Sequence, residues 1–137
     1  MQGGYPPSQV IQAIRWAPAT TILRLAKGSD NWPLTWGDDY VLYGAYGDGY
    51  GFEPFVSEKL SLGLARVHGL PPVVPGENLR STRLEQRGDD KRGRKASGLL
   101  MVEGVLYLWA RNAGNAQLAW STDHGTNWSC IPLQGIS

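Results

Sequence analysis

The second half of the chain constrains the fold most strongly, because it consists of four short apolar segments separated by turn residues. Turns are expected at 103–104, 113–115 and 124–125, and the segments between them are "SGLLMVEG", "VLYLWARNA", "AQLAWSTD" and "TNWSCIPL". Short apolar strands joined by Gly and Asn turns are typical of an antiparallel meander. We therefore predict one four-stranded sheet in this half.

The first half repeats the same organisation less regularly. An extended segment through Trp36, a turn at residues 37–39 and a run from Tyr40 to Tyr46 predict a hairpin, and the alternation in "KLSLGLARV" predicts a third strand. The polar segment "NLRSTRLEQ" is either a fourth strand or a surface loop. Residues 19–26, "ATTILRLA", predict a lone strand before the first sheet.

Composition agrees with an all-β chain. The 137 residues suit one domain, and 18 Gly, 9 Pro, 6 Trp and 6 Tyr suit short strands and tight turns. Two successive meanders predict an all-β fold of β-propeller-type four-stranded antiparallel sheets, about two blades per chain. The expected parts are an orphan outer strand (19–26), blade one (about 30–86), an exposed basic loop (87–95) and blade two (about 96–133). A sandwich of two small sheets is the alternative, because it uses the same strands.

Charge and hydropathy exclude several classes of partner. A net charge of +1 gives no field that would attract nucleic acid, and no window approaches the ~20 apolar residues of a membrane span. The N-terminus has no signal-peptide pattern, and the single cysteine, Cys130, forms no internal disulfide, so the sequence leaves the compartment open.

Three motifs resemble a known family. "STDHGTNW" is similar to the Asp-box pattern Ser-x-Asp-x-Gly-x-x-Trp of sialidase-like propellers. "GSDNWPLTWGDD", "AYGDGYGF" and "KASGLLMVEGVLYLWARN" resemble the opening blades of a bacterial propeller family, formerly a domain of unknown function, that is related to glycoside hydrolases acting on furanose polymers. The resemblance runs from about Tyr5 to Trp128. It implies a carbohydrate-active propeller whose Asp box, Ser121, Asp123, Gly125 and Trp128, is structural.

A closed propeller needs at least ~4 blades, and this chain has strands for about two. Two isolated blades expose apolar faces and strand edges. We therefore expect a homo-oligomer, with a trimer of six blades favoured, in which the orphan strand completes a blade of a neighbouring chain.

Counting strands sorts the motifs between the two ends of the blades. We call the end at which the first strand of each blade begins the near rim, and the opposite end the far rim. The turns at 37–39, 103–104 and 123–125 belong to the far rim. The near rim receives the candidate site residues Asp30, Asn31, Trp32, Asp48, Tyr50, Lys95, Ser97, Arg111 and Asn112.

The near rim therefore holds the expected sugar site. Glycoside hydrolysis uses two carboxyl groups, and the resemblance implies Asp30 as the base, with Asp48 as acid, pKa modulator or substrate ligand. A further carboxylic acid would come from Glu53, Glu58 or a neighbouring chain. Asp30 and Asp48 could instead serve only their local turns.

The other near-rim residues are expected to bind the sugar, with Trp32 and Tyr50 as stacking platforms. Trp36 and Tyr46, inside strands, are expected in the core. The alternatives to an enzyme are a noncatalytic carbohydrate-binding or assembly module and a structural fragment without a ligand. Neither His68 nor His124 has metal-ligand or Ser-His-Asp spacing, so no metal or cofactor is expected and His124 is predicted to be an exposed turn residue.

Overall fold

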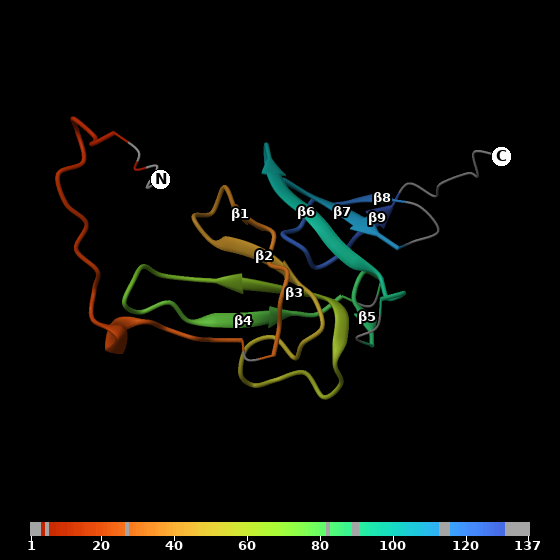
Figure 1. The fold of residues 1–137 in the computed structure, drawn as a ribbon. Helices are drawn as coiled ribbons and strands as arrows, with labels where there is room; N and C mark the ends of the chain where they lie inside the picture. The colour runs from red at the N-terminus through yellow and green to blue at the C-terminus, as the bar shows by residue number, and fades with distance from the viewer. Residues whose placement is uncertain are drawn as a thin grey trace.

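The computed structural model describes residues 4, 6–26, 28–81, 83–88, 91–112 and 116–130. These residues form nine strands and one short 3-10 helix, and every strand pair is antiparallel (Figure 1). The predicted all-β fold of two antiparallel meanders is confirmed. The described residues do not close into a ring.

In the first sheet four strands lie side by side in the order in which they occur in the sequence, and a fifth strand pairs with the beginning of the third. They are β1 (Leu34–Trp36), β2 (Leu42–Tyr46), β3 (Leu60–Val67), β4 (Gly76–Leu79) and β5 (Gln86–Arg87). The β1–β2 turn contains Asp38 and Asp39, as predicted, and the polar segment contributes only short strand ends.

The second sheet is a simple meander of four strands. They are β6 (Lys95–Val102), β7 (Val105–Arg111), β8 (Gln117–Ser121) and β9 (Ser129–Cys130). Glu103 and Gly104 join β6 to β7 with φ values of 48° and 75°. Two positive φ angles at a two-residue turn give the backbone twist that a tight hairpin requires.

The core lies between the two sheets. Alternate residues of each strand point inward, so that one face of the first sheet packs on one face of the second. Ala45 and Leu62 from the first sheet and Leu108 from the second are 0% exposed. The other members of this core are Tyr43, Leu64, Leu84, Ala96, Leu99, Leu106, Ala110, Ala119 and Trp128.

Each sheet also has an apolar outer face. In the first sheet Leu34, Gly44 and Ala65 lie opposite one another across β1, β2 and β3, pointing away from the core. In the second sheet Leu100 is paired with Tyr107, and Trp109 with Leu118, on the outward side. A second buried cluster covers part of the outer face of the first sheet, and its members are Tyr46, Phe52, Val56, Leu60 and Ala65. Leu34, Leu100 and Trp109 are nevertheless 49%, 57% and 47% exposed, so part of each outer face is open to solvent.

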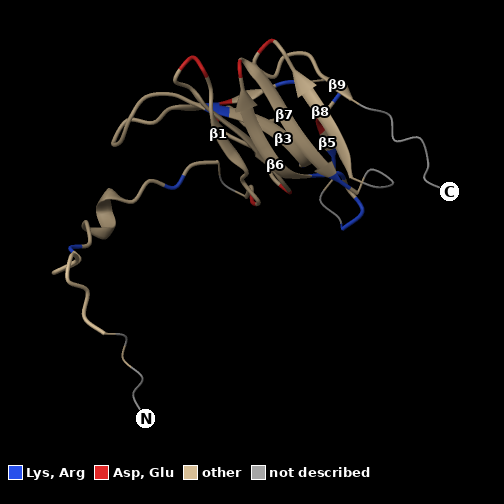
Figure 2. Ribbon diagram, turned by 90° about the horizontal axis from the view of Figure 1, so that it is seen from above, with Lys and Arg blue, Asp and Glu red and all other residues tan. Residues whose placement is uncertain are grey.

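Residues 19–26 do not form the predicted orphan strand. Ala19–Thr21 is a 3-10 helix, and the following residues join no sheet within the described chain. The first part of the described N-terminal segment runs away from the two sheets (Figure 2), and Val10 and Trp16 on it are 88% and 87% exposed. Leu23, Leu25 and Ala26, at its end, lie against the outer face of the first sheet. Without a neighbouring strand, the β-branched pattern of this segment has no ladder to join.

Two further expectations are corrected. Lys95 is not part of an exposed loop: it begins β6 and is 6% exposed, whereas Lys91 and Arg92 before it are exposed. Trp36 is not in the core, because it points to the outer face and is 57% exposed, whereas Tyr46 is buried as expected. The turn predicted at 113–115 and the end of the second blade, 131–133, lie outside the described residues.

Candidate functional site

Asp30 lies beside Asp48 because the backbone forms an isolated bridge just before β1. The Asp30 N–H donates to the Gly47 carbonyl, and the Gly47 N–H donates to the Asp30 carbonyl, both at 2.8 Å. A Cβ added at Gly47 would lie 2.9 Å from Asp30 Oδ1. The glycine therefore leaves room for the Asp30 carboxylate, which is exposed at the near rim.

Asp48 is bound by the ammonium group of Lys95. Asp48 follows β2 with a φ of 50°, and Lys95 is the first residue of β6 in the other sheet. The two side chains are 27% and 8% exposed. An ammonium group this far from water requires a charged partner, so the ion pair joins the two sheets at the near rim.

Four other predicted site residues lie around this pair. Asn31 donates its amide to the Ala96 carbonyl at 3.3 Å, and Arg111 is paired with Lys95 across β6 and β7. Ser97 is exposed in a bulge of β6, and Tyr50 is 40% exposed beyond Asp48. Counting described residues only, the rim thus offers one carboxylate without a side-chain partner, hydroxyl and guanidinium groups and one aromatic ring.

Asn112 and Trp32 were expected to bind sugar at the near rim, but in the structure both side chains make other contacts. The Asn112 amide donates to the carbonyls of Lys91 and Gly93 at 2.9 and 3.1 Å, so it anchors the loop before β6. Trp32 packs on Tyr46 and Phe52, with ring centroids 5.2 and 5.8 Å away. It therefore lies on the outer face of the first sheet.

Neither Glu53 nor Glu58 contributes a second carboxyl group next to Asp30, because no contact among the described residues joins either side chain to Asp30. Glu58 forms an ion pair with Arg87 of β5, with 2.8 Å between the charged atoms. Glu53 is exposed in the loop that follows the rim. Among the described residues no side chain hydrogen-bonds the Asp30 carboxylate, which can therefore accept hydrogen bonds from a ligand.

The Asp box is a closed hydrogen-bond network at the β8–β9 turn. Ser121 Oγ donates to Asp123 at 2.8 Å and accepts from the Gly125 N–H at 2.9 Å. The Asn127 backbone N–H and side-chain amide donate to Asp123 at 2.8 and 2.7 Å, which lowers the pKa of its carboxyl to about 2. Trp128, 3% exposed, donates to the Gly125 carbonyl at 2.9 Å.

The far rim contains a side-chain cluster that the sequence did not indicate. His124 Nε2 lies 2.8 Å from Asp38 Oδ1 and 3.9 Å from Asp39 Oδ2, and the Tyr43 hydroxyl donates to Asp39 at 2.7 Å. Strand counting placed both turns on this rim, but it could not show that Asp38 and His124 touch across the two sheets. His124 is thus partly exposed and paired.

Burial and hydrogen bonds within this cluster shift the pKa values of Tyr43 and Asp39. Burial, the hydrogen bond to Asp39 and its negative charge raise the pKa of Tyr43 to about 12. Burial opposes ionisation of Asp39, but hydrogen bonds from Tyr43 and the Val41 N–H, with His124 nearby, leave its pKa below the ordinary value.

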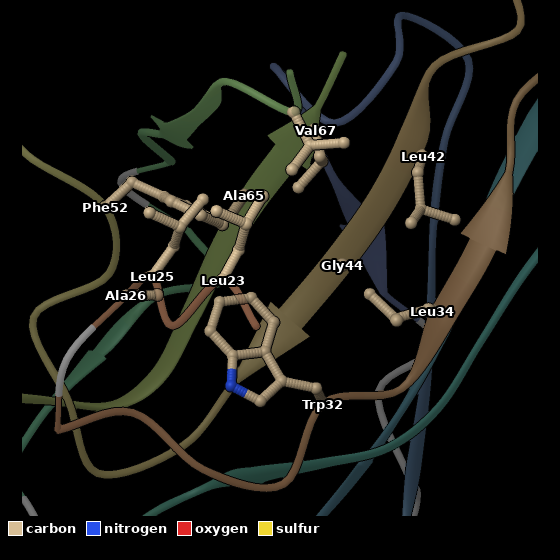
Figure 3. Close-up of a pocket in the computed structure, with 11 residues that line it drawn as sticks. Leu23, Leu25, Ala26, Trp32, Leu34, Leu42, Gly44, Phe52, Ala65 and Val67 are labelled. Carbon is tan, nitrogen blue, oxygen red and sulfur yellow. The ribbon is translucent and has the colours of Figure 1, made fainter. Parts of the chain in front are cut away.

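The outer face of the first sheet is hollowed. An apolar hollow of about 240 Å³ lies over Gly44 and Ala65, walled by Trp32 and by Leu23 and Leu25 of the N-terminal segment (Figure 3). Gly44 makes the floor low, because it carries no side chain. The remaining lining residues are Ala26, Leu34, Leu42, Phe52, Val67 and Val74.

Comparison with known proteins adds no relative. No family model, curated protein or solved structure matches the chain. Within the part of the chain that the structure describes, no helix has the length and apolar character needed to cross a bilayer.

Proposed function

We propose that the chain is a noncatalytic carbohydrate-binding protein of the glycoside hydrolase-like propeller class, with its sugar site at the near rim. The observation that supports this most is the convergence of Asp30, Asp48 and Lys95. The Asp30–Gly47 backbone bridge places Asp30 beside the residue that precedes Asp48, and the ion pair joins Asp48 to Lys95 of the second sheet. Hydroxyl-rich ligands are recognised by such fixed charged acceptors and donors.

The division of roles follows from the contacts. Asp48 is occupied by Lys95, so it positions the rim, whereas the exposed Asp30 carboxylate accepts hydrogen bonds from sugar hydroxyls. Arg111 donates beside them, and the half-exposed Tyr50 offers a ring face for stacking. Hydrolysis requires a second carboxyl group acting with Asp30, and the described near rim offers only the ion-paired Asp48.

Sugar binding is tested by titrating furanose and sialic-acid polymers into the full chain and measuring heat or fluorescence. We expect binding without release of reducing sugar. Asp30→Ala removes a charged acceptor and weakens binding about 10-fold to 100-fold, corresponding to about 1.5–3 kcal/mol. Asp30→Asn retains an amide oxygen and leaves binding nearly intact.

The matched control is Asp123→Ala at the far rim, which leaves sugar affinity unchanged. Equal loss in Asp30→Ala and Asp123→Ala, or no binding by the wild type, contradicts the proposed site. Turnover that disappears in Asp30→Asn contradicts the noncatalytic assignment and favours a hydrolase.

A second candidate function is assembly with further copies of the same chain. The observation that favours it is the unlike shape of the two apolar outer faces. The first sheet has a hollow over Gly44 and Ala65, whereas the second sheet presents the large side chains of Leu100 and Trp109. We propose that the second sheet of one chain packs on the hollow of the next, continuing the order in which the two sheets pack within each chain.

A further inference from the structure

We infer that Asp38, Asp39 and His124 form a binding site for one divalent transition-metal ion, such as Zn²⁺, which joins the two sheets at the far rim. Asp38 and Asp39 lie in the β1–β2 turn of the first sheet, and His124 lies in the β8–β9 turn of the second. The potential ligand atoms all lie within 4.8 Å of one another. No other group of three such residues converges in the part of the chain that the structure describes.

The distances suit a small cation. Bonds of about 2.0–2.2 Å place neighbouring ligand atoms ~2.8–3.6 Å apart in octahedral or tetrahedral coordination. His124 Nε2 lies 2.8 Å from Asp38 Oδ1, at the lower end of that range, and 3.9 Å from Asp39 Oδ2, just above it. We expect rotation of the Asp38 and His124 side chains, which are 53% and 37% exposed, to bring their ligand atoms onto a centre shared with Asp39.

Two of the three ligands are already oriented. The Tyr43 hydroxyl and the Val41 N–H donate to Asp39 at 2.7 and 3.1 Å, which fixes its carboxylate. The Tyr43 ring is stacked on the His124 ring, with centroids 5.8 Å apart and an angle of 29°. Groups that hold ligands in this way raise metal affinity by lowering the cost of ordering them.

The ligand types select the class of metal. An imidazole nitrogen with two carboxylates suits zinc and the other late first-row ions, whereas Ca²⁺ and Mg²⁺ prefer oxygen ligands alone. With neutral His124 the three side chains carry two negative charges, which a divalent cation neutralises. Water completes the coordination, because the cluster is open to solvent.

The chain contains a matched pair that lacks these properties. His68 Nε2 also lies 2.8 Å from a carboxylate, that of Glu77. The same Glu77 oxygen is bound by Arg66 at 2.5 Å, so a guanidinium stands where a second carboxylate would be required. His68 therefore controls for binding by any exposed histidine.

The test is calorimetric titration of ZnCl₂ into the chelator-treated full chain, together with thermal unfolding with and without zinc. We expect one zinc per chain and a higher unfolding temperature, because the ion links the two sheets. His124→Asn and Asp38→Asn abolish both effects, and His68→Ala changes neither. Asn is chosen at position 124 because it is among the side-chain-bearing residues that best tolerate the φ of 55° there.

Tyr43→Phe tests whether a residue that positions a ligand, without binding the metal itself, affects zinc affinity. It retains the ring that stacks on His124 but removes the hydroxyl on Asp39, and we expect about a 10-fold loss of zinc affinity. Far-UV circular dichroism checks that each variant is folded. The proposal is overturned if the wild type binds no zinc, or if folded His124→Asn binds zinc as tightly as the wild type.

Discussion

At the scale of single residues, the ion pair between Asp48 and Lys95 is unequal, and its two halves should respond differently to mutation. The Lys95 side chain is 8% exposed, whereas that of Asp48 is 27% exposed. Removing one partner leaves the other charge without compensation, and the cost depends on how well water can reach it. The more buried lysine is therefore the more costly charge to leave alone.

We expect Asp48→Asn to lower the free energy of unfolding by about 3 kcal/mol and Lys95→Met by about 1–2 kcal/mol. The double variant Asp48→Asn/Lys95→Met should recover most of the loss, since no charge then remains inside. Urea unfolding of the four proteins measures all these values. This expectation is contradicted if the two single variants lose equal free energy of unfolding, or if the loss in the double variant equals the sum of the two single losses.

At the scale of elements, the β8–β9 turn couples stability to acid. The folded-state pKa of Asp123 is about 2, below the ordinary value of 3.8, so its ionised form stabilises the hairpin. A lowered carboxyl pKa contributes stability that is fully present above about pH 4 and is lost as the pH falls toward 2. The carboxyls of Asp39 and Glu77, whose pKa values are also lowered, act in the same direction.

We therefore expect the urea midpoint of the wild type to fall steadily between pH 4 and pH 2. Asp123→Asn should be less stable at pH 6 but should lose less on acidification, because the asparagine does not titrate. Midpoints measured every half pH unit at constant ionic strength test this. If the urea midpoints of the two proteins fall in parallel with pH, Asp123 is not the group that causes the loss of stability in acid.

Elements were predictable from the sequence where a local pattern determines them. The Glu103-Gly104 and Asp38-Asp39 turns, the strand β3 and the Asp box each depend on neighbouring residues, and each is found in the structure. The alternation expected in β3 is not found, because its residues from Leu60 to Ala65 are all buried by packing on both faces of the sheet. The segment 19–26 was not predictable, because a strand pattern forms a strand only when a ladder is available. Trp36 was placed wrongly because an aromatic residue in a strand can point to either face.

The candidate sites were predictable in part. Strand counting brought Asp30, Asp48, Lys95 and Arg111 to one rim, and their contacts in the structure agree with that count. Their roles in sugar binding stay predictions. The Asp38–His124 contact joins residues of different sheets, so it depends on how the sheets pack, which no local sequence pattern specifies.

At the scale of the whole molecule, the two outer faces predict a defined mass in solution. Continued packing of unlike faces favours three chains of 15.0 kDa each, giving six blades. Leu34→Lys places a charge at the hollow, and Trp109→Lys places one on the opposite outer face. We expect each variant to sediment as a single chain, whereas Leu70→Lys, at an exposed position in the β3–β4 connection, leaves the mass unchanged.

Mixing the two defective variants sharpens this prediction. Leu34→Lys retains an intact second-sheet face and Trp109→Lys retains an intact hollow, so the mixture should form a dimer through one interface. Like-to-like packing gives a different result, because each variant would then pair with itself through its intact face. A wild type that sediments as a monomer at all concentrations contradicts assembly.

In the assembly that we propose, a stack of chains has a direction, because it ends in a free hollow on one side and in a free second-sheet face on the other. Growth of such a stack would stop only when the last chain meets the first, and the angle between the two sheets of each chain would set how many copies that takes. Substitutions in the core around Leu62 and Leu108, which hold that angle, should therefore alter the number of chains, while changes on the outer faces alter only how tightly they adhere. An angle that misses closure yields an open helical filament from the same contacts.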